Sequence, residues 1–222
     1  MRKIISALTV VICTTVACEQ APKADKAKVT EAQTVQVGTG NAYLADTATS
    51  VVEWVGTKPT GKHHGTLKLA GGAIYVKDDT TITGGQLTIN MHSLRNIDLA
   101  ADTSMQHKLE NELKGSLFFD VNQFPSATFE ITSVKPFRPS VGEDVELKDA
   151  THTILGNLSI KGVTKNISFP AKITIDPHKV TAIASFNIDR TLWGINYRAD
   201  KSLQDKLINS LVNISLHITA TR

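Results

Sequence analysis

Histidine is the residue type in this sequence with the widest chemical use, because its imidazole binds metals and transfers protons near neutral pH. The chain has seven histidines among its 222 residues. His63 and His64 are adjacent, and in an extended chain their side chains point to opposite faces, so they cannot chelate one ion together. The sequence contains neither a His-Glu-x-x-His motif nor paired metal-binding cysteines. We therefore expect no metal site and no required cofactor.

Acid–base catalysis by histidine is an alternative that the sequence leaves open. His64 or His92, together with a carboxylate such as Glu110, would supply the proton transfers that hydrolysis needs. Covalent catalysis has less support, because the Gly-x-Ser-x-Gly motif is absent and the chain's two cysteines, Cys13 and Cys18, both precede the expected domain. We therefore predict that the chain is not an enzyme.

The longest regular pattern that would position any site lies in the C-terminal half. Apolar and polar residues alternate over 153–161, 163–175 and 180–188. Turn sequences, Lys161-Gly162 and Asp176-Pro177-His178, separate these runs. A period of two, rich in β-branched residues, is typical of a strand with one buried face. Three such strands joined by short turns predict an antiparallel meander.

Shorter alternating patterns bring the number of expected strands to about eight. They cover 49–57, 66–76, 86–92, a segment around Phe129 and Ile131, and 210–220. Between them, Met105, Leu109 and Leu113 lie four residues apart behind the N-cap candidate Asp102, which predicts a short helix. We expect an all-β fold, an extended antiparallel β-barrel with one short helical insertion that closes one end of the sheet.

The N-terminus has the composition of an export signal. Arg2 and Lys3 precede a short apolar run from Ile4 to Val16, which is too short to span a bilayer comfortably. The tetrad Thr15-Val16-Ala17-Cys18 resembles a lipobox. We therefore predict a lipoprotein-type signal peptide over residues 1–17.

Cleavage before Cys18 would leave a chain whose single cysteine is its first residue, so no disulfide could form within it. Such a cysteine resembles the acylated residue of bacterial lipoproteins, and several acyl chains hold a protein stably on a membrane. Glu19 follows it, instead of the aspartate that resembles an inner-membrane retention signal. We predict lipidation of Cys18 and an exported, periplasmic protein, with the outer membrane as the favoured anchor.

Residues 18–46 are rich in Ala, Lys, Thr and Gln and show little periodicity. This composition predicts a flexible tether, followed by a folded domain over residues 47–222. The formal net charge of +3 is too small to argue for a nucleic-acid partner.

Five blocks of the sequence resemble the YceI-like domain family. They are His64-x-x-Leu67, Leu109 to Asp120, Phe124 to Phe129, Gly156 to Thr164, and Ile188 to Ile195, in this order between roughly Thr49 and Arg222. Members of this family resemble lipocalins in shape. Their apolar bore holds a polyisoprenoid chain, such as an isoprenoid quinone or a polyprenyl phosphate. The resemblance implies the same fold and the same class of ligand here.

A barrel that holds an apolar ligand needs an apolar inward face, and the alternating strands supply one. Candidate lining residues are Trp54, Phe129, Phe169, Phe186 and Ile188, with packing of a closed core as the alternative. Trp193 would cover the barrel mouth or cap the core. Arg190 suits contact with a phosphate head group, and an ion pair with Asp189 that holds the loop is the alternative.

The leading hypothesis is a non-enzymatic protein that binds, stores or transports an isoprenoid lipid. Its partners would be that lipid and a membrane reached through Cys18, and the oligomeric state stays open, a dimer included. Two other classes are a hydrolase that uses histidine and carboxylate residues, and a barrel packed solid that serves as an interaction or adhesion module.

Overall fold

The structure is a computed structural model that describes residues 20–139, 145–200, 203 and 206–222. The predicted signal peptide and Cys18 lie outside these residues. The described part contains one eleven-stranded sheet. Eight of the strands form the barrel: β4 (Val51–Lys58), β5 (Gly61–Lys77), β6 (Thr81–Asn96), β7 (Ser126–Pro136), β8 (His152–Ile160), β9 (Val163–Asp176), β10 (Lys179–Asp189) and β11 (Leu211–Thr221).

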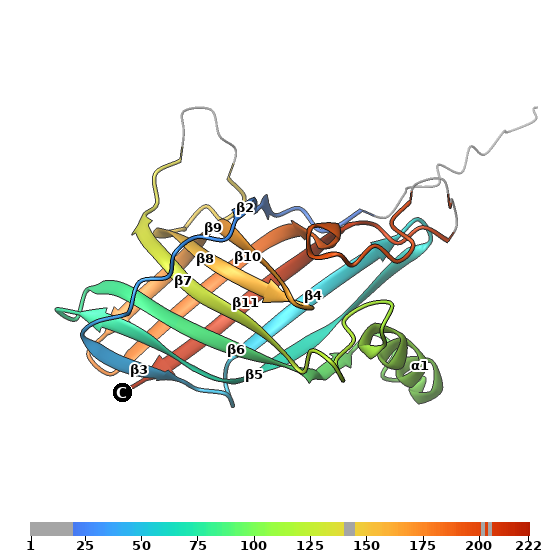
Figure 1. Ribbon diagram of the computed structural model, residues 1–222, viewed down its shortest axis with the longest axis horizontal. Coiled ribbons are helices and arrows are strands. Elements are labelled where there is room, and N and C mark those ends of the chain that lie inside the picture. Colours follow the sequence, from blue (N-terminus) through green and yellow to red (C-terminus); the bar gives the residue numbers. More distant parts are fainter. Residues whose placement is uncertain (1–19, 140–144, 201–202, 204–205) are drawn as a thin grey trace, which may run out of the picture.

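Each barrel strand pairs antiparallel with the next one in the chain, and β11 pairs back with β4. This closure confirms the expected antiparallel barrel of about eight strands (Figure 1). The alternating runs of the C-terminal half become β8, β9 and β10. In β9, for example, Ile167, Phe169, Ala171 and Ile173 are all buried, because every second side chain of a strand faces the same side of the sheet.

A glycine pair bends the long hairpin of β5 and β6. The pairing register shifts between Leu69 and Gly71, and both Gly71 and Gly72 have positive φ angles. A Cβ atom at Gly72 would lie 2.3 Å from the carbonyl oxygen of Gln86, so only glycine fits there. The resulting bulge increases the local twist and lets the wall curve into a barrel.

The expected tether is wrong for the part that the structure describes. Residues 20–45, which we call the strap, contain β1 (Asp25–Lys26), β2 (Lys28–Glu31) and β3 (Asn41–Ala45). The strap wraps around the outside of the barrel from β10 to β5 (Figure 1). Its composition is polar because it pairs through its backbone and buries few side chains, notably Ala27 and Tyr43.

The strap also completes the barrel wall. Strands β9 and β10 pair with each other only through Lys172–Asp176 of β9 and Lys179–Ile183 of β10. Nearer the end of β10, its residues Phe186 and Asn187 pair with β1, and the facing part of β9 pairs with β2. Ala27 connects β1 and β2, and its amide donates to the carbonyl of Asn187 over 3.0 Å. The strap therefore fills the seam where β9 and β10 separate.

Four buried asparagines fasten the strap from the outer face of the barrel. Asn157 exchanges two hydrogen bonds with the backbone of Gln33, at 2.9 and 2.7 Å. Asn187 donates to the carbonyl of Pro22 over 3.0 Å. Asn166 and Asn213 donate to the side-chain oxygens of Asn157 and Asn187, which orients both amides toward the strap. Buried amides of this kind need such partners, because an unpaired one would lose its hydrogen bonds to water.

The helix α1 (Thr103–Lys114) lies at one end of the barrel, as expected (Figure 1). Asp102 caps it, and its carboxylate accepts the Met105 amide at 3.0 Å. Two hydrogen bonds tie the helix to β6: Gln106 donates to the carbonyl of Asn96, and Glu110 accepts the amide of Asn96. No helix in the described ranges is long and apolar enough to cross a membrane.

Candidate functional site

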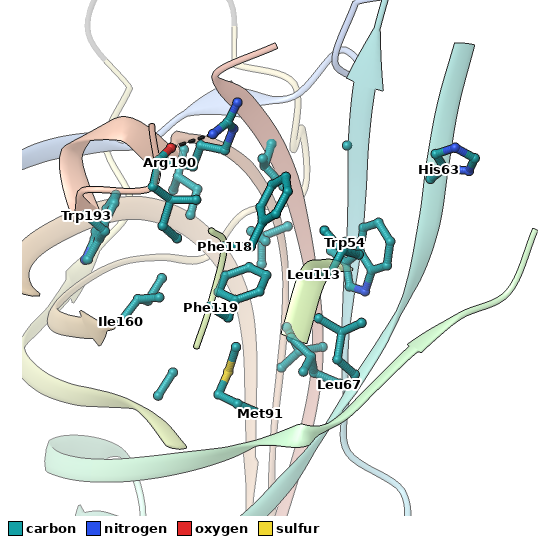
Figure 2. Close-up of a pocket in the computed structure, with 18 of the residues that line it drawn as sticks. Trp54, His63, Leu67, Met91, Leu113, Phe118, Phe119, Ile160, Arg190 and Trp193 are labelled. Carbon is teal, nitrogen blue, oxygen red and sulfur yellow. Dashed lines mark hydrogen bonds between the residues drawn. The ribbon is translucent and has the colours of Figure 1, made fainter. Parts of the chain in front are cut away.

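The half of the barrel beside α1 is hollow. It contains a cavity of about 550 Å³. Figure 2 shows lining side chains from the strands, from the segment after α1 and from the 3-10 helix η1 (Arg190–Trp193) gathered around this space. All of the sequence-predicted lining residues border it: Trp54, Phe129, Phe169, Phe186, Ile188, Arg190 and Trp193.

Three phenylalanines form the floor of the cavity on the side of β7, β9 and β10. Phe169 stacks on Phe186 with ring centroids 4.0 Å apart, and Phe129 lies 5.9 Å from Phe169. Gly156 makes room for Phe129, because a Cβ there would lie 2.3 Å from the phenyl ring. Below the floor, the other half of the barrel is filled by a cluster that includes Tyr43. The barrel is therefore packed in one half only, and the alternative of a solid barrel is wrong.

Helix α1 covers the open end of the cavity. Met105, Leu109 and Leu113, the residues that predicted the helix, all border the cavity. Met105 is also 49% exposed, so the apolar face of the helix is not sealed against the barrel. The sequence pattern predicted the helix and its apolar face. It did not predict the polar contact between Gln106 and Asn96, because buried amides have no periodic signature.

Arg190 holds the loop that follows η1. Its guanidinium donates to the backbone carbonyls of Ile195, Tyr197, Ile208 and Asn209. Burial lowers the pKa of Arg190 from its ordinary value, and the nearby Asp189 opposes this shift. Arg190 therefore holds the loop, as the alternative predicted, but its partners are backbone carbonyls and not the carboxylate of Asp189. Asp189 instead caps η1 by accepting from Thr191.

The two tryptophans of the chain both border the cavity but differ in their hydrogen bonding. The indole N–H of Trp193 donates to the carbonyl of Leu158 over 2.9 Å, and the residue is completely buried. The indole N–H of Trp54 is buried and, among the described residues, has no hydrogen-bond partner. A buried donor without a partner is costly, so Trp54 Nε1 is a local loss of stability in this wall of the barrel.

A cluster around Asp98 fastens the rim between β5 and α1. Its carboxylate binds the Nδ1 atom of His63 at 2.7 Å and the amide of His64 at 2.8 Å, and it also accepts from Asn96. Partial burial disfavours the Asp98 charge, but the hydrogen bonds from His64, His63 and Asn96 outweigh it and lower the pKa of Asp98. His63 also borders the cavity, a position that the sequence did not indicate.

Basic side chains surround the open end of the cavity, which we call the mouth. Lys58, Lys108, Arg198 and Lys206 all border it. Glu112 is the acidic residue among the cavity-lining residues of the described chain. Sequence reasoning missed this ring, because its members come from three separate segments that only the fold brings together.

His64, His92 and Glu110, the residues named for the hydrolase alternative, are not joined in one site. His64 lies near Asp98, Glu110 accepts from the Asn96 amide, and His92 is exposed with its amide bonded to Asn90. Within the ranges that the structure describes, no group of three or more His, Cys, Asp or Glu side chains is placed to hold a metal ion. The structure therefore does not bring His64, His92 and Glu110 together as one catalytic group.

A closed antiparallel barrel with an apolar cavity at one end has the lipocalin-like form, in which a fold encloses a small apolar molecule. The family model of the YceI-like domain matches residues 43–220. The chain therefore belongs to the YceI-like domain family.

Curated relatives match over short segments. A UPF0312 protein from Yersinia pestis (strain Pestoides F) is 34% identical over 65 residues, which are 29% of this chain and 28% of the relative. A UPF0312 protein from Enterobacter sp. (strain 638) is 36% identical over 87 residues, 39% of this chain and 35% of the relative. The matched segments thus span about a third or less of the length of these relatives.

Solved structures share the fold at low identity. Burkholderia cenocepacia BcnA aligns with a TM-score of 0.59 and 20% identity, over 80% of this chain and 99% of BcnA. A polyisoprenoid-binding domain from Saccharophagus degradans, implicated in plant cell wall breakdown, aligns with a TM-score of 0.56 and 15% identity, over 81% of this chain and 97% of the domain. These likenesses show the fold.

Proposed function

We propose that this chain binds an isoprenoid lipid in the hollow half of its barrel, and stores or transports it. The observation that carries the proposal is the cavity of about 550 Å³, which is lined mainly by apolar side chains and opens beside α1. A cavity of this kind binds an apolar chain by removing it from water, and it needs no catalytic group to do so.

The cavity volume sets the length of chain that fits. At roughly 30 Å³ for each water-sized group, it holds on the order of eighteen carbon atoms, or about three to four isoprene units. Each five-carbon unit that leaves water contributes about 3–4 kcal/mol before the cost of ordering the chain. Three units therefore suffice for tight binding, and the rest of a longer chain would extend through the mouth or displace the phenylalanine floor.

The charges at the mouth favour an isoprenoid with an anionic head group, of the polyprenyl phosphate type. Lys58, Lys108, Arg198 and Lys206 would face a phosphate held there, and lysine and arginine are the usual phosphate partners. Arg190 is less suited to this role, because backbone carbonyls already occupy its guanidinium. A quinone is the second candidate, since the apolar lining of the cavity would hold its isoprenoid chain equally well.

We further propose that the protein is exported to the periplasm and anchored through an acylated Cys18. The support comes from the sequence, in which a basic start, an apolar run and a lipobox-like tetrad precede this cysteine. An anchored carrier would keep its ligand close to the bilayer that supplies it.

The test is mass spectrometry of the organic extract from protein purified from its native host. Met91→Trp places a larger side chain in the cavity, and Ile183→Trp adds the same side chain on the outside of β10, where Ile183 is 44% exposed. Wild type and Ile183→Trp should carry one isoprenoid per chain, while Met91→Trp should carry none. A folded wild-type protein whose extract contains no isoprenoid would contradict the proposal. The mass of the bound lipid decides between the phosphate and quinone types.

A further inference from the structure

The exposed apolar side chains of this protein are unevenly distributed. Nine large ones are exposed among the described residues, and five of them belong to segments around the mouth: Ile97, Met105, Leu117, Leu192 and Leu203. Single exposed apolar residues are common on any protein surface. A group of them around one opening indicates an interaction site.

Each of the five adjoins a residue of the cavity wall or rim. Met105 itself borders the cavity, Leu117 precedes the lining residue Phe118, and Leu192 lies in η1 between Arg190 and Trp193. Ile97 precedes Asp98, which binds the lining residue His63. Leu203 lies between Arg198 and Lys206, both of which border the mouth.

Two of these apolar side chains lie three residues from basic residues of the mouth. Met105 and Lys108 are both exposed on helix α1, and Leu203 and Lys206 are both exposed on the segment before β11. Apolar side chains that enter the acyl boundary, next to cations that meet anionic head groups, are the combination by which peripheral proteins bind a bilayer. A protein partner would not require the opening of a lipid-sized cavity at the centre of the contact.

The strap brings the N-terminus of the described chain to this same end of the barrel. Pro22 is bonded to Asn187, two residues before β10 ends at Asp189 and η1 begins. Cys18 precedes Pro22 by four residues, and four residues span at most about 14 Å. A lipid on Cys18 would therefore hold the mouth, rather than the packed end, against the bilayer.

We propose that the rim of the mouth is a membrane-docking surface that faces a bilayer containing anionic lipids. This inference rests on the proposed function and adds the route by which the lipid enters and leaves the cavity. The isoprenoid passes between bilayer and cavity through the mouth, and its chain does not cross water. The strap orients the protein for this transfer.

Flotation with lipid vesicles tests the docking surface without the acyl anchor. The protein is a chain of residues 19–222, which keeps every described strand and the helix. The vesicles contain phosphatidylethanolamine and phosphatidylglycerol at about three to one, with pure phosphatidylcholine vesicles for comparison. The rim variant is Met105→Ser/Leu117→Ser/Leu192→Ser. The matched control, Val35→Ser/Val37→Ser/Leu44→Ser, removes three exposed apolar side chains elsewhere.

The chain should float with the anionic vesicles, and the rim variant should bind them at least about tenfold more weakly. The control variant should bind like the unmodified chain. Equal binding by both variants, or no flotation of the unmodified chain, would overturn the docking surface. A chain that carries isoprenoid but does not float contradicts only this inference, whereas one that floats but never carries isoprenoid contradicts the proposed function.

Discussion

The substitution Phe169→Ala tests whether the phenylalanine floor sets the length of the bound chain. Phe169 is 2% exposed, stacks on Phe186 and lies between the cavity and the packed half of the barrel. Removing its ring adds on the order of 100 Å³ to a cavity of about 550 Å³, which is room for roughly three further carbon atoms, or most of one isoprene unit. The variant should therefore accept a longer chain than the wild type.

The same substitution destabilises the fold by a calculable amount. Truncation of a buried phenylalanine to alanine costs about 3–5 kcal/mol. We expect about 3 kcal/mol, because the ring already borders an open space and loses packing on one side only. The melting temperature should fall by about 6–12 °C.

Fluorescence titration with prenyl phosphates of increasing length measures the effect on binding, since both tryptophans border the cavity. Wild-type affinity should rise with length up to about four units and then level off, and the variant should level off about one unit later. Ile173→Ala is the control, because Ile173 is buried below the floor and does not border the cavity. It should lower the stability and leave the length limit unchanged. If Phe169→Ala also leaves the limit unchanged, the floor does not determine chain length.

Three further perturbations test the parts that support the cavity. Arg190→Gln removes the cation that binds four backbone carbonyls. It should lower the unfolding free energy by about 3 kcal/mol and increase amide hydrogen exchange in residues 195–200. Unchanged exchange would show that the loop is stable without Arg190. Asn187→Ala removes the side-chain hydrogen bond to Pro22, so it should lower the unfolding free energy by about 1–2 kcal/mol and speed amide hydrogen exchange in the strap near Ala27. Exchange as slow as in the wild type would refute the fastening role of Asn187. Burial lowers the pKa of His152, so the unfolded chain binds more protons and stability should fall as the pH drops through about 6.5. In a plot of the urea midpoint against pH, His152→Asn should flatten the curve in this range. An unaltered slope would show that other groups cause the pH dependence.

The strands were predictable because the barrel has one buried face. In β8, β9 and β10 that face imposes a period of two, and the same parity placed Phe169, Phe186 and Ile188 in the cavity wall. Helix α1 was predictable for a similar reason, since Asp102 caps it and Met105, Leu109 and Leu113 share one side.

The strap was not predictable from periodicity. It fills the seam between β9 and β10 and then crosses the outside of the barrel, so its hydrogen bonds come from the backbone and its burial is confined to a few positions such as Ala27 and Tyr43. The four asparagines that fasten it lie on four different strands and meet only in the fold. Polar residues on alternating strands normally face water, so Asn157 and Asn187 gave no signal of their own.

The cavity and its charges depend on tertiary packing. Apolar parity alone cannot separate a filled interior from a hollow one, because both need the same inward face. The filled half begins where three phenylalanines from β7, β9 and β10 meet, and Gly156 is what allows Phe129 to reach that contact. The mouth combines Lys58, Lys108 and Arg198 from segments far apart in the sequence.

The most direct test of the central claim is a fluorescence titration of the delipidated chain with a prenyl phosphate about four units long. Trp54 and Trp193 are the two tryptophans and both border the cavity, so a ligand inside it must alter their emission. Binding in the cavity predicts a saturable change with one ligand per chain. A folded protein whose emission does not respond to the prenyl phosphate, or to a quinone of the same length, would show that the cavity is not an isoprenoid site.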